Sequence, residues 1–172
     1  MKHLLTIFIL ILTLHVTTLK AADALPEYTL KAAYLYNFAL LTDWPPNQQE
    51  AEEFNLCIYK SDSLGKAFDV LSQKQISRKP IKVSYSTSLE ELKGCHLIFV
   101  PNGNTKSQNK QLIKTVKQLP ILLVSDDYKL DEVHIQILQS NDRLIFTINT
   151  KLLAQIGLNL SSRLLNLAKE VK

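Results

Sequence analysis

HLIFVPNGN, at residues 96–104, is an apolar segment of strand length that runs directly into a polar loop with proline and glycine. The same succession recurs in ILLVSDD at residues 121–127, and residues 107–118 between them carry their apolar side chains on one helical face. Apolar strands that alternate with amphipathic helices are typical of a parallel sheet covered on both faces, because parallel neighbours are joined by crossover connections. These segments predict an α/β fold.

The same alternation extends towards the N-terminus. A helix should begin near Pro26 and end before Trp44-Pro45-Pro46, because proline cannot continue a helix. The elements expected next are a solvated connection at 48–53, a strand at 54–59, a turn at 61–65, a helix at 66–71, a strand at 81–85 and a short helix through Leu92 that Ser88 caps.

The C-terminal third departs from this rhythm. Residues 133–138 and 143–148 flank Ser140-Asn141-Asp142, which predicts an antiparallel hairpin, and a final helix should begin near Leu158. The fold class expected is a single-domain, mixed but mostly parallel sheet with helices on both faces. This is a doubly wound, Rossmann-like or flavodoxin-like three-layer sandwich with a C-terminal antiparallel hairpin.

The first 24 residues resemble an export signal. Lys2 and His3 precede an apolar run at residues 4–14, which is shorter than the roughly 20 residues of a membrane span. Small residues suggest cleavage after Ala24, with Ala21 as the other candidate, and an uncleaved membrane anchor is the alternative. We therefore expect a signal peptide at 1–24 and an exported α/β domain at 25–172, not inserted in the membrane after cleavage.

Composition excludes several classes of function. The chain is 46% hydrophobic and 21% charged, as globular proteins are, and its formal charge of +4 comes from lysines scattered among acidic residues. Nucleic-acid binding is not expected, because it requires a concentrated basic surface. Neither a GxGxxG nor a phosphate-binding P-loop pattern occurs, so no nucleotide cofactor is expected.

The chain has two cysteines, Cys57 and Cys95, both in apolar segments. Buried free thiols would be the ordinary interpretation in the cytosol, whereas export favours a disulfide. Cys95 and His96 are adjacent in a predicted strand and so point to opposite faces, which argues against a catalytic thiol–imidazole pair. With so few histidines no metal site is expected, and we identify no catalytic residues.

Polar residues after the predicted strands are the candidate ligands for a bound molecule, because ligands of open α/β sheets bind beyond the carboxyl ends of strands. Asp126 and Asp127 would suit a cation or a basic ligand, although aspartates are also ordinary turn residues. Arginines are candidate anion ligands, although on a hairpin or terminal helix they are more often simply exposed. The candidates are Asn102, Asn104, Asp126, Arg143 and Arg163.

The segments above also occur, in this order, in a known family. The chain resembles the YfiR family of exported bacterial proteins over nearly the whole of its mature length. The matching pieces are residues 31–38, Trp44-Pro45, 56–58, 65–68, 79–83, 95–100, 122–126, 146–149 and 157–168. Family members often carry a glycine pair where this chain has residues 128–133, and some carry a second cysteine pair that is absent here.

The resemblance implies a regulator and not an enzyme. The best-known member is similar to a repressor that binds the periplasmic sensing domain of an inner-membrane diguanylate cyclase and restrains cyclic-di-GMP signalling and biofilm formation. The cysteine pair at 57 and 95 matches the family's structural disulfide. The partner expected is such a cyclase or a sensor kinase, and the sequence leaves open whether the chain also forms a homodimer. The other hypotheses are a periplasmic small-molecule-binding module and, least favoured, a hydrolase or thiol enzyme.

Overall fold

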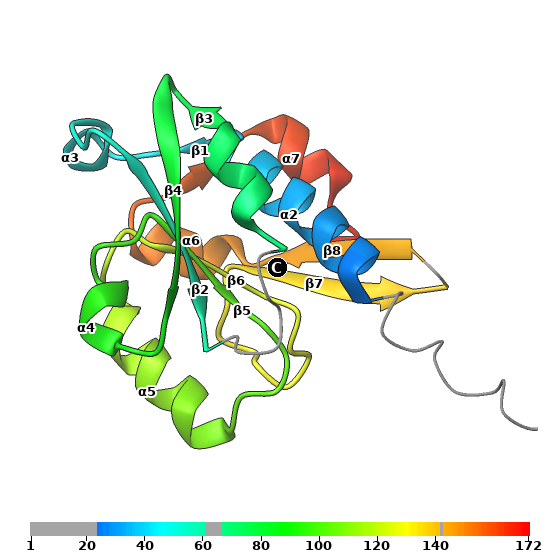
Figure 1. The fold of residues 1–172 in the computed structure, drawn as a ribbon. Helices are drawn as coiled ribbons and strands as arrows, with labels where there is room; N and C mark the ends of the chain where they lie inside the picture. The colour runs from blue at the N-terminus through cyan, green and yellow to red at the C-terminus, as the bar shows by residue number, and fades with distance from the viewer. Residues whose placement is uncertain (1–23, 61–66, 142) are drawn as a thin grey trace, which may run out of the picture.

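The computed structural model describes residues 24–60, 67–141 and 143–172, in which a twisted sheet lies between two layers of helices (Figure 1). The sheet has the order β10-β8-β7-β6-β5-β2-β4-β3. Its strands are β2 (Phe54–Tyr59), β3 (Gln75–Ile76), β4 (Lys79–Ser86), β5 (Leu97–Val100), β6 (Leu122–Ser125), β7 (Ile135–Ser140), β8 (Arg143–Ile148) and β10 (Glu170–Val171). A separate pair joins β1 (Thr42–Asp43) to β9 (Asn159–Leu160).

Five of these strands are parallel and form the centre of the sheet. β2 pairs with β4 on one side and with β5 on the other, and β6 and β7 follow in sequence. The spatial order β4-β2-β5-β6-β7 is the doubly wound order 2-1-3-4-5 of flavodoxin-like sheets. β7 and β8 form the expected antiparallel hairpin. The predicted fold class is therefore confirmed.

The two faces of the sheet are buried under different helices. Because side chains alternate along a strand, Leu56 and Ile58 of β2 join one core cluster while Cys57 and Tyr59 join the other. The first cluster lies under α2 (Ala24–Leu40), α6 (Thr150–Gln155) and α7 (Ser162–Leu167), and the second lies under α4 (Leu89–Leu92) and α5 (Lys106–Val116). Two-sided burial explains why the central strands are continuously apolar.

Several predicted boundaries were wrong. A 3₁₀ helix, η1 (Asp69–Gln73), replaces the helix expected at 66–71, and residues 61–66 with the expected turn lie outside the described residues. The connection at 48–53 begins with part of a short helix, α3 (Pro46–Gln49), which Pro46 initiates. The final helix begins at Ser162 and not near Leu158, because Asn159 and Leu160 pair with β1 and Ser161 then caps the helix. Residues 1–23 of the predicted leader at 1–24 are likewise outside the described part.

Two histidines complete the amino-terminal edge of the parallel sheet. His96 donates its backbone N–H to Asn55 O at 2.9 Å and accepts the Asn55 N–H on Nδ1 at 3.0 Å. His134 makes the same pair with Leu123, at 3.0 and 2.8 Å. In each case a neutral imidazole nitrogen replaces a strand carbonyl as the acceptor, and protonation of that nitrogen would destroy the bond.

Burial lowers the pKa of His134 from 6.5 to about 4. Below pH 6.5 the unfolded chain binds a proton at His134 that the folded chain does not. The neutral, buried His134 therefore contributes its full stabilisation above pH 6.5, and this stabilisation is lost as the pH falls towards 4. The difference corresponds to about 3 kcal/mol. Chemical unfolding of the wild type as a function of pH should show this loss.

His134→Asn is the matched test, because asparagine Oδ1 can accept the same N–H without titrating. The variant should fold at neutral pH and lose less stability than the wild type between pH 6.5 and 4. Burial also lowers the pKa of His96, with Lys79 adding to the effect and the Gln48 carbonyl opposing it, so His96→Asn should act in the same direction. Equal pH dependence in wild type and His134→Asn would contradict this assignment.

A disulfide joins Cys57 of β2 to Cys95, which stands just before β5. Both residues are 3% exposed and lie in the second core cluster, beneath α4 and α5. The bond spans 38 residues of sequence, and chain-entropy reasoning gives it about 3–4 kcal/mol of stability. It therefore ties together two parallel neighbours that β4 and α4 separate along the chain.

Replacing both cysteines by alanine should lower the free energy of unfolding by about 3–4 kcal/mol, because the unfolded chain regains the freedom that the bond removes. Urea denaturation of the variant and of the oxidised wild type measures the difference. Reduction of the wild type should produce a similar loss, and a variant as stable as the oxidised protein would refute the role given to this bond.

Candidate functional site

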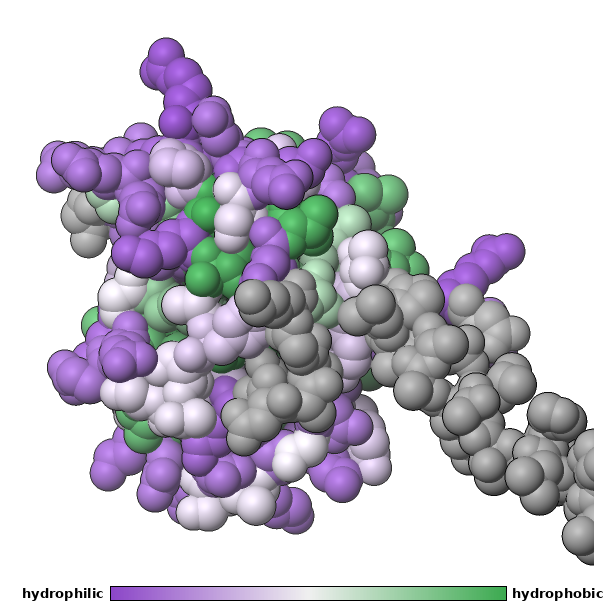
Figure 2. All heavy atoms as spheres, viewed as in Figure 1, coloured by the Kyte–Doolittle hydropathy of each residue, from purple (hydrophilic) through white to green (hydrophobic). Residues whose placement is uncertain are grey.

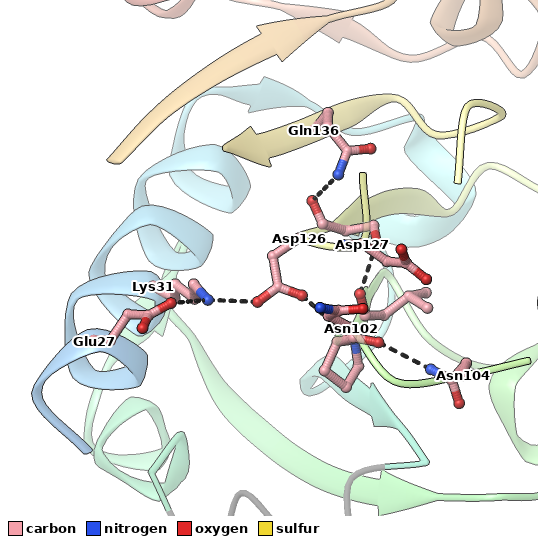
Figure 3. Close-up of polar contacts among 10 residues, drawn as sticks. Glu27, Lys31, Asn102, Asn104, Asp126, Asp127 and Gln136 are labelled. Carbon is pink, nitrogen blue, oxygen red and sulfur yellow. Dashed lines mark hydrogen bonds and ion pairs between the residues drawn. The ribbon is translucent and has the colours of Figure 1, made fainter. Parts of the chain in front are cut away.

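The carboxyl ends of β5 and β6 meet the N-terminal part of α2 at a cluster of polar side chains (Figure 3). Asp126 directly follows β6, Asn102 follows β5, and Lys31 projects from α2 towards both. Lys31 Nζ lies 2.5 Å from Asp126 Oδ2 and also contacts Glu27 Oε1, one helical turn earlier. The three charged groups form a row, with the ammonium between two carboxylates.

Lys31 and Asp126 are both withdrawn from water, with side chains only 6% exposed. Burial alone would lower the pKa of Lys31, but its hydrogen bonds to Asp126 and Glu27 outweigh that effect and raise the pKa. The Tyr28 ring, whose centroid lies 4.5 Å from Lys31 Nζ, adds a cation–π contact. The lysine is therefore a permanently charged, immobilised group.

Asp126 uses its second oxygen to hold the loop after β5. The Asn102 N–H donates to Asp126 Oδ1 at 2.6 Å, and Asn104 Nδ2 donates to Pro101 O within the same loop at 3.0 Å. Thr105 then caps α5 through a capping box with Gln108. One carboxylate thus fixes α2, β6 and the β5–α5 loop relative to one another.

Asp127 has a different role, because it points into the opposite face of the sheet and is 1% exposed. Its carboxylate accepts the Lys129 N–H and the Asn109 Nδ2–H, and its own N–H donates to Ser125 Oγ. These bonds shape the turn after β6. Asp127 is thus a turn residue, as the alternative interpretation had it, but it is buried where a solvated turn was expected.

The structure brings together three of the five candidate ligand residues and separates the other two. Asn102, Asn104 and Asp126 lie at the carboxyl end of the sheet. Arg143 begins β8 and is exposed, while Arg163 is exposed on α7 beside Leu164 and Leu167, at an apolar groove. The pairing with Lys31 also makes Asp126 less available to a ligand, because the charge of its carboxylate is already balanced within the chain.

Sequence reasoning missed the two helix residues that complete the cluster, Glu27 and Lys31. The available signal was that Lys31 shares a helical face with Leu35 and Phe38, where a buried lysine requires a partner. The sequence did not indicate that this partner is Asp126, which is 95 residues further along the chain.

A pocket of about 410 Å³ opens beside the row of charges. Its polar wall consists of Glu27, Tyr28, Lys31, Asn102 and Asp126, and its other wall comes from the β7–β8 hairpin and Tyr128, with Ile137, Leu138, Gln139 and Leu144. Volumes of this size accommodate small organic molecules. The cluster combines fixed charges with an apolar surface, which suits binding and positioning.

The thiol–imidazole pair considered from the sequence has no catalytic geometry. Cys95 is bonded to Cys57, and the His96 ring stacks on Phe54 with centroids 4.8 Å apart. Among residues 24–60, 67–141 and 143–172, no group of three or more His, Cys, Asp or Glu side chains is placed to hold a metal ion.

The fold and this site define the chain as a disulfide-bonded α/β sandwich with a pocket at the carboxyl end of its sheet. No helix in the described part of the chain is both long and apolar enough to cross a membrane. The chain belongs to the YfiR/HmsC-like family, whose model matches residues 28–169. The resemblance read from the sequence is thereby confirmed. Comparison with curated proteins gave no match.

Lys31→Met should lower the free energy of unfolding by about 3 kcal/mol, because it leaves the Asp126 carboxylate buried without its counter-ion. In an Asp126→Asn background the same substitution should cost at least about 1 kcal/mol less, because the two side chains act as a unit. Urea denaturation of the two single variants and the double variant completes the cycle. Lys93→Met, in the exposed pair with Glu90, is the control and should have little effect. Additive losses from the two single variants would contradict the coupling.

Proposed function

We propose that the mature chain is a periplasmic regulator that binds the sensing domain of an inner-membrane diguanylate cyclase, or of a similar sensor, and lowers cyclic-di-GMP signalling and biofilm formation. Membership of the YfiR/HmsC-like family is the observation that carries the proposal. It acts by occupying a partner and not by catalysis.

Two features of the chain support export. The leader at residues 1–24 has the order of a secretory signal, with a basic start, an apolar run and small residues at its end. The buried bond between Cys57 and Cys95 belongs to an oxidising compartment, where paired cysteines stay bonded. Both agree with a protein that folds and works in the periplasm.

The surface of α2 and its neighbours offers an apolar area for a protein partner. Leu30 on α2 and Val70 on η1 are 49% and 44% exposed, and hydrophobic atoms gather over this part of the molecule in Figure 2. Leu40 and Leu167 are 47% and 64% exposed at a groove of about 330 Å³ that Arg163 also lines. Exposed apolar patches of this kind are typical of interaction surfaces.

A small-molecule-binding module that reports to a receptor is the second candidate function. The pocket beside Lys31 and Asp126 favours it, because its position beyond the carboxyl ends of parallel strands is where open α/β sheets bind ligands. The two candidates are compatible, since a regulator can carry a ligand pocket as well as a docking surface.

Deletion of the gene should raise cellular cyclic-di-GMP and surface attachment, because the cyclase loses its restraint. Wild-type chain supplied in trans should reverse both effects, whereas Leu167→Asp should fail to do so, since a charge in the groove opposes apolar docking. Cyclic-di-GMP measured in extracts and quantified biofilm are the readouts.

Gln118→Asp is the matched control, because it places the same charge on an exposed residue in the turn just after α5, on the opposite face of the sheet. It should restore repression fully. Unchanged cyclic-di-GMP on deletion would count against the regulatory function. Full repression by a folded Leu167→Asp variant would show that the partner docks on another surface.

A further inference from the structure

The pocket at the carboxyl end of the sheet carries an unbalanced charge. Glu27, Lys31 and Asp126 are the charged residues of its wall, so two carboxylates face one ammonium. Lys31 and Asp126 neutralise each other in a contact that is closed to water, with both side chains 6% exposed. The excess negative charge therefore lies on Glu27, which is 40% exposed at the mouth of the pocket.

The wall also has polar groups that are free to meet a ligand. Within the described residues, Glu27 Oε2, the Tyr28 hydroxyl and the side-chain amides of Asn102 and Gln139 have no hydrogen-bond partner. Burial, with the nearby Asp126 carboxylate, raises the pKa of Tyr28, so the hydroxyl stays neutral. By contrast, the Lys31 ammonium already has two carboxylate partners and the Tyr28 ring.

We infer that this pocket binds a small organic cation, whose ammonium or guanidinium group pairs with Glu27 and whose carbon chain lies against the hairpin. The inference deepens the second candidate function and rests on it, by naming the chemical class of the ligand. A cation restores charge balance at the mouth without competing for Lys31, whereas an anion would have to displace Glu27 or Asp126 from that residue.

The apolar wall distinguishes an organic cation from a metal ion. Ile137 is 1% exposed, and with Leu138 and Leu144 it forms a surface that would contact carbon atoms. Calcium requires six to eight oxygen ligands, and the aliphatic side of this pocket supplies none. The Tyr28 and Tyr128 rings also line the pocket, and each already lies beside a lysine ammonium, of Lys31 and Lys129 respectively.

Lys31 positions the Glu27 carboxylate in this site. Its contact with Glu27 holds that carboxylate against α2 and leaves the second oxygen for the ligand. The ligand therefore meets a preorganised acceptor, and less conformational entropy is lost on binding.

Isothermal titration of the oxidised mature chain with agmatine, putrescine and benzylamine tests the inference. At least one should bind saturably, and affinity should fall as ionic strength rises. Glu27→Gln should weaken that binding at least tenfold, and Tyr28→Phe should weaken it to a smaller degree. Glu90→Gln, at an exposed carboxylate on α4, should bind as the wild type does. Thermal unfolding checks that each variant is folded.

Three results would overturn the inference: no binding of any of the three amines, binding that Glu27→Gln leaves intact, or preferential binding of the dianion glutarate. Calcium, titrated in parallel, should not bind. The outcomes also separate this inference from the regulatory function. If the chain restrains the cyclase but binds no amine, only the ligand inference is wrong. If it binds an amine but its deletion leaves cyclic-di-GMP unchanged, only the proposed regulatory function is wrong.

Discussion

The ion pair between Lys31 and Asp126 is the constraint on which the arrangement of this molecule depends. A buried charge without a counter-ion is strongly destabilising, and the Lys31 and Asp126 side chains are each only 6% exposed. α2 must therefore pack so that Lys31 lies beside the carboxylate that follows β6. Asp126 also holds the Asn102 N–H, so the same carboxylate fixes the loop after β5. Both the pocket and the apolar surface of α2 take their positions from this one contact.

The opposite end of the sheet is held by different means. His96 and His134 serve as neutral acceptors for strand N–H groups, and the Cys57–Cys95 bond joins β2 to the segment before β5. These contacts make the amino-terminal edge sensitive to acid and the central strands sensitive to reduction. A periplasmic protein meets external pH and an oxidising environment, so these sensitivities match the proposed location.

The sequence was sufficient for the central strands and insufficient for the contacts between distant segments. β2, β5 and β6 were predicted because they are apolar on both faces, and Asp126 was placed at the right edge because it follows such a strand. The two-residue strands β9 and β10 were missed, since two residues carry no periodicity. Lys31 was missed because its partner is defined only by tertiary packing.

The proposed function is one of binding and not of catalysis, in which the exported, oxidised chain would hold a membrane cyclase by its periplasmic domain. In-cell crosslinking followed by mass analysis of the captured complexes tests it most directly. We expect the processed chain, two hydrogens lighter than its reduced mass, to be linked to an inner-membrane protein with a cytoplasmic diguanylate cyclase domain. Recovery of the reduced, unprocessed chain from the cytosol, with no such partner, would contradict it.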